Sequence, residues 1–312
     1  MDPALTIGMM EGFLVAFTPN LREDNLAWYQ LETRDSSQLD ELAEQYKLHP
    51  VHIEDCRDHS GRIKIDMMPD YLFVTLKPLH IVEEEIAESP LHIFVGRNFC
   101  ITIGDTECAP VREAMERAWR AGSDTAPAKI LYLIFDTVVD AYFSTVDHLD
   151  DHIDLIEDDV LDDPSPKILA SIFENKRQLI DLRRIIVATR DIGMHLQRDS
   201  GDLVDSNLYP FFRDIYDHLL RLADTIDTLR DLLNNTLDVY LSSVANRTNQ
   251  VMKVLTVLST VAIPAIVISG IYGMNLKGLP FLESDYGSAI VGGLMLLSTV
   301  SLLVFLRKMR WL

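Results

Sequence analysis

Two long uncharged segments near the C-terminus limit what this chain can fold into. Residues 254–276 contain no Asp, Glu, Lys or Arg, and neither do residues 286–306. Each segment is mostly apolar and close to the roughly 20 residues that a helix needs to cross the hydrocarbon core of a bilayer. We therefore expect two transmembrane helices. The alternative, a buried hairpin inside a soluble core, does not explain two runs of this length with charged flanks.

The charges that flank the two segments predict their orientation. Basic residues lie on the outer flanks of the pair: Arg247, Lys253, Arg307, Lys308 and Arg310. The link between the segments holds Lys277 against Glu283 and Asp285. Short flanks rich in Lys and Arg stay on the cytoplasmic side. We expect a multi-pass protein of the inner or plasma membrane, with both termini in the cytoplasm and Glu283 and Asp285 in an outer loop.

The acidic balance of the chain narrows its possible partners. The 312 residues carry 48 Asp and Glu against 28 Lys and Arg, a formal net charge of −20. Nucleic-acid binding is disfavoured, because phosphate contacts need clustered Lys and Arg. A negative surface instead raises the local concentration of cations. No phosphate-binding loop and no nucleophile–base set stands out, so neither an enzyme nor an organic cofactor is indicated.

The cysteines and the N-terminal segment point to the cytosol. Cys56, Cys100 and Cys108 are an odd number without a C-x-x-C pair, which suits a reducing compartment. We expect each of them to be a small buried hydrophobe. The first residues include Asp2 and no apolar run, so we expect no cleaved signal there.

Short apolar segments alternate with helical ones in the first third of the chain. Strands are predicted at 13–18, 27–32, 63–65, 71–76, 91–95 and 99–103, helices at 36–47 and 110–119, and a turn at His49–Pro50. This alternation predicts a cytoplasmic α/β domain over residues 1–125, followed by a linker around Gly122.

A group of histidines within this domain suggests a metal site at first sight. His49, His52, Cys56 and His59 lie close in sequence to Glu54 and Asp55. The spacings fit no standard zinc pattern, in which ligands are paired two to four residues apart on each side. We therefore favour a structural helix-and-turn cluster over a zinc site.

Residues 126–206 are expected to form an antiparallel helical hairpin. Its first helix ends in the acid-rich stretch 147–163, Pro164 and Pro166 interrupt it, and the returning helix is basic from Lys176 to Arg198. Solvated faces with weak surface pairs are a simpler explanation of this pattern than a specific ion site.

Residues 207–275 are predicted to form one stalk helix that continues into the first transmembrane helix. At 1.5 Å per residue its length is on the order of 100 Å. Apolar residues at intervals of three and four predict a seam for neighbouring helices: Leu219, Leu222, Ile226, Leu229, Leu233, Leu237, Tyr240 and Val244. Acidic residues recur at every seventh position, roughly opposite this seam: Asp217, Asp224, Asp231 and Asp238. This stripe is either a solvated outer face or, if several copies surround an axis, the wall of a conduit.

The segment Tyr272-Gly-Met-Asn275 resembles the YGMN signature of the CorA family of divalent-cation transport proteins. The similarity extends through residues 246–256, Pro264 and the tail residues Trp311-Leu312, and more loosely through the segment 49–77. The resemblance implies an α/β cytoplasmic domain, a long helical stalk and two C-terminal transmembrane helices. It divides the chain into residues 1–125, 126–206, 207–275, an outer loop at 276–285, and 286–312 with the second span and a basic tail.

The resemblance also implies a homopentamer whose first spans surround a pore. Its selectivity filter would be Gly273, Met274 and Asn275, where amide and carbonyl oxygens contact a cation that keeps its water shell. Together with the acidic stripe it implies further pore-lining positions at Asp238, Asn249, Met252, Leu255, Ser259, Ile263, Ile266 and Gly270.

Cytosolic Mg²⁺ closes channels of this family by bridging acidic residues between subunits. Asp214 matches the stalk-side member of that regulatory site, and Glu83 is our choice for its partner within residues 82–85. The chain departs from the family at Phe281, where relatives often carry an acidic residue, and at Ile266, where relatives can carry a polar one. The loss of an acidic residue at Phe281 and the positive charge of Lys277 weaken the expected electrostatic attraction at the outer mouth.

The leading hypothesis is a passive Mg²⁺ channel that also admits Co²⁺ or Ni²⁺, with the bilayer and identical subunits as its partners. A zinc transporter of the related ZntB branch is the alternative, because Asn275-Leu-Lys-Gly278-Leu-Pro280 resembles the N-x-x-G-x-P loop of that branch. A membrane-anchored sensor or scaffold that conducts nothing is a third.

Overall fold

The computed structural model describes most of the chain. The described residues are 8–10, 13–16, 27–31, 37–58, 61–82, 85–105, 112–113, 116–117, 120, 126–198, 203–274, 279–281, 286–309 and 311. The chain separates into two compact units. The first comprises residues 1–159 with 165–236, and the second comprises residues 160–164 with 237–312. Each unit is described by itself.

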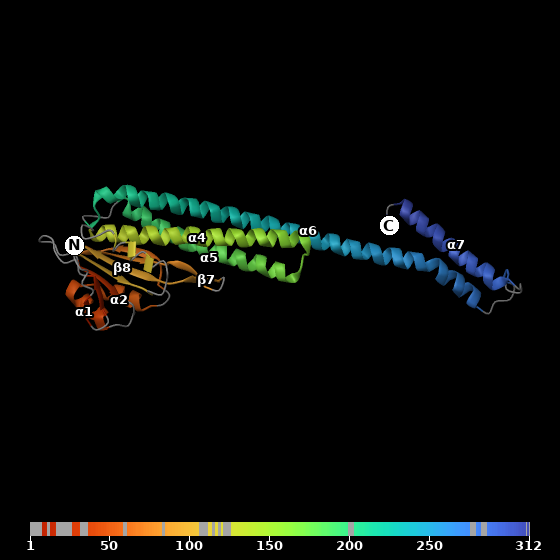
Figure 1. Ribbon diagram of the computed structural model, residues 1–312, viewed down its shortest axis with the longest axis horizontal. Helices are drawn as coiled ribbons and strands as arrows, with labels where there is room; N and C mark the ends of the chain where they lie inside the picture. The colour runs from red at the N-terminus through yellow and green to blue at the C-terminus, as the bar shows by residue number, and fades with distance from the viewer. Residues whose placement is uncertain are drawn as a thin grey trace, which may run out of the picture. The chain divides into compact units, whose positions relative to one another are not determined.

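A seven-stranded sheet forms the centre of the N-terminal part (Figure 1). Its strands, in spatial order, are β1 (Gly8–Met10), β2 (Phe13–Ala16), β3 (Ala27–Leu31), β9 (Phe99–Ile103), β8 (Leu91–Gly96), β5 (Tyr71–Leu76) and β4 (Lys64–Met67). Only the β3–β9 pair is parallel, with Ala27 opposite Phe99. Every residue of β5, β8 and β9 is buried. Their continuous apolar sequences therefore belong to strands that are covered on both faces.

Helices cover both faces of this sheet. Figure 1 shows α1 (Ser37–Tyr46) and α2 (Pro50–Arg57) on one side and the long helices α4 (Pro127–Asp162) and α5 (Pro166–Leu196) on the other. Leu39 and Ile53 pack with Phe73 and Phe94 in the core beneath α1 and α2. On the other side, the Tyr142 hydroxyl of α4 donates to the Lys77 carbonyl oxygen at 2.9 Å.

The turn predicted at His49–Pro50 is wrong, because helix α2 begins there. Proline is favourable at the first position of a helix, where its missing N–H leaves no intrahelical hydrogen bond unmade. His49 caps the helix by accepting a hydrogen bond at Nδ1 from the Val51 backbone N–H at 3.3 Å. The hairpin β6 (Leu79–Val82) and β7 (Glu85–Glu88) was also not predicted. The predicted helix at 110–119 and the linker around Gly122 lie mostly outside the described residues.

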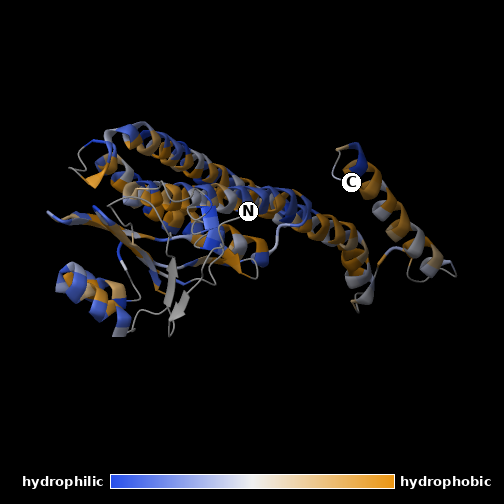
Figure 2. Ribbon diagram, turned by 60° about the vertical axis from the view of Figure 1, so that its left-hand side comes forward, coloured by the Kyte–Doolittle hydropathy of each residue, from blue (hydrophilic) through white to orange (hydrophobic). Residues whose placement is uncertain are grey.

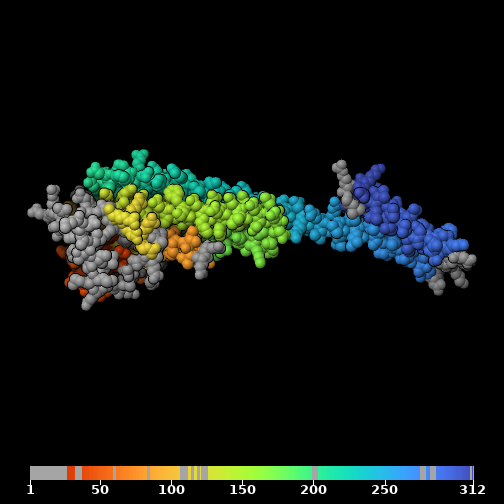
Figure 3. Space-filling model, viewed as in Figure 1, coloured from red at the N-terminus to blue at the C-terminus, as the bar shows by residue number. Residues whose placement is uncertain are grey.

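Three helices pack along one another in the first unit. After α4, α5 and a short 3₁₀ turn at Ser206–Leu208, the chain enters α6 (Tyr209–Gly273). The Tyr132 ring of α4 lies 5.2 Å from the Phe211 ring of α6 between centroids, and the two helices run side by side in Figure 3. The predicted apolar seam of α6 is buried at Leu219, Leu222, Ile226, Leu229, Leu233 and Tyr240, whereas Val244 is exposed.

The second unit contains the last part of α6 and helix α7 (Gly287–Lys308). Figure 2 shows that both helices are strongly apolar there. Both are long and apolar enough to cross a membrane, and only 0% and 6% of their most apolar windows are buried. They are therefore not the core of the described structure, as the buried-hairpin alternative would require. The predicted fold class, an α/β domain followed by a long helix and two C-terminal apolar helices, is confirmed.

Candidate functional site

One side of α6 carries all the described residues of the predicted pore. With a helical step of about 100° per residue, they fall within an arc of about 120°. They are Asp238, Asn249, Met252, Leu255, Ser259, Ile263, Ile266, Gly270, Gly273 and Met274, and all of them are exposed. We call this set the candidate pore face. Its large apolar members Met252, Leu255, Ile263 and Ile266 are 54–64% exposed. Isolated exposed apolar residues are common, but a continuous apolar stripe calls for a partner outside the chain.

The opposite side of α6 faces α7. The half-buried residues of this segment are Val257, Thr260, Val261, Pro264, Ala265, Ile268 and Tyr272. They centre about 150° away from the candidate pore face around the helix axis. Gln250, Lys253, Val257 and Val261 of α6 line a cavity of about 610 Å³ together with Leu303 and Trp311. Helix α7 therefore covers one side of α6 and leaves the candidate pore face free within the chain.

Among the described residues of the chain, Gly270 and Gly273 have no side-chain neighbour. A Cβ atom built at either position would meet no heavy atom within 4 Å. Packing inside one chain therefore does not require glycine here. Helix α6 ends at Gly273, after which the Met274 backbone N–H donates to the Ile271 carbonyl oxygen at 3.3 Å. The other predicted site residues of this end, Asn275, Glu283 and Asp285, lie outside the described residues.

In the link between α6 and α7, one of the described residues has an unusual backbone. Phe281 has φ = 68°, in the left-handed region that residues with a Cβ seldom adopt. The preceding residue, Pro280, accepts a hydrogen bond at its carbonyl oxygen from the Tyr272 hydroxyl at 3.2 Å. This contact ties the link to the end of α6. The backbone at Phe281 is therefore set by the link rather than by its own preference.

The four aspartates that recur every seven residues are exposed on the first part of α6. Asp217, Asp224, Asp231 and Asp238 all reach solvent, opposite the buried seam. Asp227 lies outside this stripe and is engaged differently: its carboxylate accepts hydrogen bonds from Arg183 of α5. The stripe is thus a surface that no other described element of its own chain covers.

Asp214, the predicted regulatory residue, belongs to a larger acidic neighbourhood. Its side chain is 68% exposed, and its Oδ2 lies 3.9 Å from Nε2 of His218. Asp136 and Asp140 on α4 contribute to the electrostatics of the same region, and Arg117 lies 2.7 Å from Asp136 and 3.3 Å from Asp140. Burial raises the pKa of Asp136, although Arg117 opposes this shift.

Sequence reasoning did not single out Asp136 and Asp140. Their spacing of four residues on a helix that accompanies α6 was the available signal, but the pairing of the two helices was needed to use it. Glu83, the predicted partner of Asp214, lies outside the described residues.

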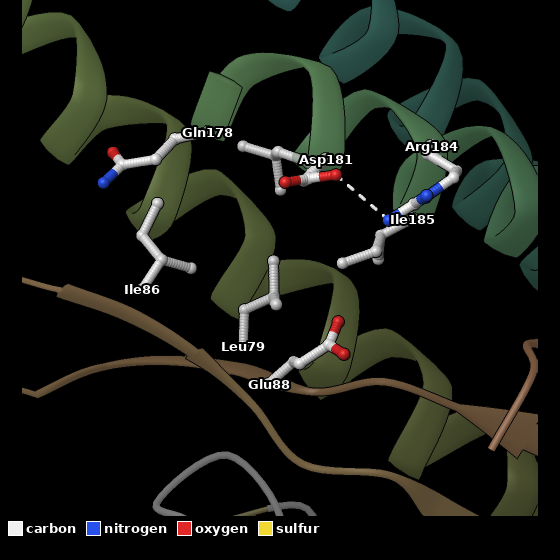
Figure 4. A pocket seen from close by; sticks show the side chains of 8 residues that line it. Leu79, Ile86, Glu88, Gln178, Asp181, Arg184 and Ile185 are labelled. Atoms are coloured by element: carbon white, nitrogen blue, oxygen red, sulfur yellow. Dashed lines mark hydrogen bonds and ion pairs between the residues drawn. The ribbon is translucent and has the colours of Figure 1, made fainter. Parts of the chain in front are cut away.

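A small cavity lies beside the hairpin that leads to Glu83. It has a volume of about 220 Å³ and is lined by Leu79, Ile86 and Glu88 of the hairpin and by residues of α5. Figure 4 shows Asp181 and Arg184 of α5 joined by an ion pair of 3.0 Å at its rim. Glu88 is engaged as well, with Lys77 at 2.6 Å. The charges at this cavity are therefore largely neutralised by their neighbours.

The histidines near α2 form a structural network. His52 Nδ1 lies 2.9 Å from the Tyr71 hydroxyl, and His52 Nε2 lies 3.3 Å from Asp66 Oδ2. Cys56 is buried in the core, and His59 lies outside the described residues. In the part of the chain that the structure describes, no group of three or more His, Cys, Asp or Glu side chains is arranged to hold a metal ion.

The described contacts of four basic residues of α5 go to α5 itself and to α6. Arg184 and Arg190 bond to Asp181 and Asp191 of their own helix. Arg183 bonds to Asp227 of α6, and Lys176 donates to Asn234 Oδ1 of α6 at 2.7 Å. The acidic and basic stretches of the hairpin therefore do not neutralise each other through these contacts.

These features define a membrane protein with a large α/β and helical head and two C-terminal spans. The chain belongs to the family of CorA-like Mg²⁺ transporter proteins. The model of this family matches residues 23–308 of the chain.

Curated and solved relatives agree with this assignment. The cobalt/magnesium transport protein CorA of Thermotoga maritima is 36% identical over 277 residues, covering 87% of this chain and 79% of the relative. The complete structure of the CorA magnesium transporter from Methanocaldococcus jannaschii matches with a TM-score of 0.81 and 22% identity, covering 95% of this chain and 94% of that one. The cytoplasmic domain of ZntB from Vibrio parahaemolyticus matches less well, with a TM-score of 0.60 and 14% identity over 72% of this chain and 88% of that one.

Proposed function

We propose that this chain forms a homopentameric, passive channel for Mg²⁺ that also admits Co²⁺ and Ni²⁺. The observation that carries the proposal is the candidate pore face, an exposed face of a membrane helix that α7 does not cover. One pair of spans cannot enclose a conduit, so several copies must contribute this face. The relative from Thermotoga maritima is named a cobalt/magnesium transport protein, which supports the choice of cations.

In this proposal the cation is selected at the outer end of α6. Carbonyl oxygens crowd the C-terminal end of a helix with partial negative charge. Asn275 side chains above the Gly273 carbonyls then bind the hydrated ion. Mg²⁺ dehydrates reluctantly and tends to keep its waters. A neutral amide ring therefore holds the ion weakly enough for it to move on.

The membrane potential drives entry and an apolar constriction controls it. Two charges crossing 100 mV gain about 4.6 kcal/mol, so no chemical fuel is required. Met252 and Leu255 lie toward the cytosolic end of the candidate pore face, where a narrow apolar ring closes by losing its water. Asp238 follows below as an acidic ring that attracts the cation inward.

Cytosolic Mg²⁺ regulates the channel at Asp214 in this proposal. Asp214 is strongly exposed, and with Asp136 and Asp140 it contributes negative charge around Tyr132, so the region favours a cation from the cytosol. Binding between neighbouring heads stabilises the closed, symmetric arrangement, and its loss favours other arrangements. Glu83 is the proposed partner from the α/β domain.

Zinc transport of the ZntB type is the second candidate. The similarity of the head to the cytoplasmic domain of ZntB favours it, although the CorA relatives match more strongly. Purified protein in proteoliposomes separates the two: an indicator inside the vesicles should report Mg²⁺ entry that grows with an inside-negative potential. Asn275→Ala should abolish this entry, while Ser288→Ala, at the same membrane end of α7, should not. Zinc entry that depends on protons, without Mg²⁺ entry, would reject the channel for Mg²⁺.

A further inference from the structure

Two histidines of α4 form a close pair on the head, away from the histidine network of α2. His148 and His152 are four residues apart on one helix, so their side chains project from the same side. Their ring centroids are 4.5 Å apart, with 46° between the ring planes. Both side chains are half-buried and remain accessible from solvent. Two histidines at this helical spacing are an arrangement that binds transition-metal ions in proteins.

One nitrogen of this pair has no hydrogen-bond partner in the part of the chain that the structure describes. His148 Nε2 is buried and meets no donor or acceptor there. A buried polar atom without a partner destabilises a fold, because the hydrogen bond it made to water in the unfolded chain is lost. A bound cation would satisfy this nitrogen, since an unprotonated imidazole nitrogen is a metal ligand.

The surface around the pair is acidic. Asp147, Asp151 and Asp154 lie on the same stretch of α4, within one turn of the histidines. An acidic surface raises the local concentration of cations, whatever their chemical type. The chemistry of the ligands then decides which cation is retained.

We propose that His148 and His152 form a binding site for one borderline divalent transition-metal ion, such as Ni²⁺, Co²⁺ or Zn²⁺. Imidazole suits these ions, whereas Mg²⁺ prefers oxygen ligands and keeps its waters. The two rings supply two ligands, and water supplies the others. The site distinguishes cations by ligand type, independently of the proposed filter and of Asp214.

Calorimetry with Ni²⁺ on the full-length, untagged protein in detergent tests this site. An excess of Mg²⁺ in the buffer occupies the oxygen-ligand sites, so that the remaining heat reports binding to nitrogen ligands. We expect saturable binding of one Ni²⁺ per chain. His148→Gln and His152→Gln should each weaken it by on the order of tenfold or more, because a bidentate site loses one ligand. His195→Gln, an exposed single histidine of α5, should leave it unchanged.

A rescue variant tests whether weaker Ni²⁺ binding results from the loss of a ligand or from unfolding of the protein. Adding Asp151→His to His152→Gln restores a pair at a spacing of three, which also lies on one side of the helix, and should recover much of the affinity. Equal Ni²⁺ affinity in the wild type and both single variants would overturn the proposal, as would displacement of Ni²⁺ by Mg²⁺. Both outcomes are read without measuring transport, so they do not depend on the proposed channel function.

Discussion

The guanidinium of Arg183 on α5 donates two hydrogen bonds to the carboxylate of Asp227 on α6, at 2.9 Å from Nε and 3.1 Å from Nη2. This bidentate contact lowers the pKa of Asp227, through the hydrogen bonds first and the opposite charge of Arg183 as well. Fork-like pairs of this geometry are the stronger kind of ion pair. It joins two helices of the first unit at a point where neither side chain is deeply buried.

We expect Asp227→Asn to destabilise the head by about 0.5 kcal/mol at neutral pH, because water screens a pair that is more than a third exposed. A carboxyl with a lowered pKa contributes stability above its ordinary range near 3.8 and loses it as the pH falls through the lower value of the folded state. The difference between wild type and variant should therefore vanish in strong acid. Thermal unfolding midpoints across pH measure it, with Asp224→Asn, an exposed residue of the same helix, as the control. A difference that persists or grows in acid would contradict this assignment.

His52 should make the head less stable in mild acid. Burial lowers the pKa of His52 below its ordinary value of 6.5, against the opposing effect of Asp66. The unfolded chain then binds a proton more readily than the folded one, so stability is full above about pH 6.5 and falls as the pH drops below it. His52→Asn should flatten the dependence of the unfolding midpoint on pH between about 5 and 6.5. The exposed His195→Gln should leave this slope unchanged, and an equally flat slope in that control would contradict the role of His52.

The link between the spans offers a test of backbone strain. Because Phe281 has φ = 68°, a residue without a Cβ fits this position best. We expect Phe281→Gly to be more stable than Phe281→Ala by about 1 kcal/mol, since both remove the ring but only alanine keeps the unfavourable contacts of Cβ. Unfolding midpoints of the two variants in detergent give the difference. Equal stability would show that this residue does not adopt the left-handed conformation in the membrane protein.

The candidate pore face predicts opposite outcomes for two neighbouring positions on α6. Leu255→Ser should increase Mg²⁺ leak through closed channels several-fold, because a polar ring stays hydrated where an apolar ring loses its water. Val257→Ser, which points toward the cavity beside α7, should change leak little. Flux into proteoliposomes under high Mg²⁺ on the cytosolic side measures both. A larger leak in Val257→Ser would place the conduit on the other side of the helix.

Several features of the fold could be predicted because single residues and local patterns determine them. The buried strands β5, β8 and β9 are short apolar runs between turn residues, and the seam of α6 repeats at helical intervals. The seam weakens toward its C-terminal end, where Leu237 is half-buried and Val244 is exposed. The two spans follow from length and charge alone.

Other features depend on contacts that sequence patterns do not contain. Helix α2 was missed because Pro50 suits a helix start as well as a turn, and the capping contact of His49 decides between them. Strand β6 is a short and largely exposed LHIV segment, and β7 begins and ends with glutamate, so neither gives the longer apolar run of a buried strand. The neighbourhood of Asp214 required knowing that α4 accompanies α6, which places Asp136 and Asp140 nearby. The filter and pore roles remain predictions, since they concern contacts between copies of the chain.

The proposed regulatory site gives the most direct test of gating. Asp214→Lys replaces a metal-binding carboxylate by a positive charge that repels the cation, so inhibition by millimolar Mg²⁺ on the cytosolic side should weaken strongly. The variant should still conduct, because Asp214 lies far along the sequence from the filter. Asp224→Lys makes the same charge change on an exposed residue of the same helix and should keep near-normal inhibition. Flux into proteoliposomes, measured as a function of Mg²⁺ on the cytosolic side, compares the two. Unchanged inhibition in Asp214→Lys would remove Asp214 from the regulatory site, and equal loss in both variants would indicate a general effect of charge rather than a bound ion.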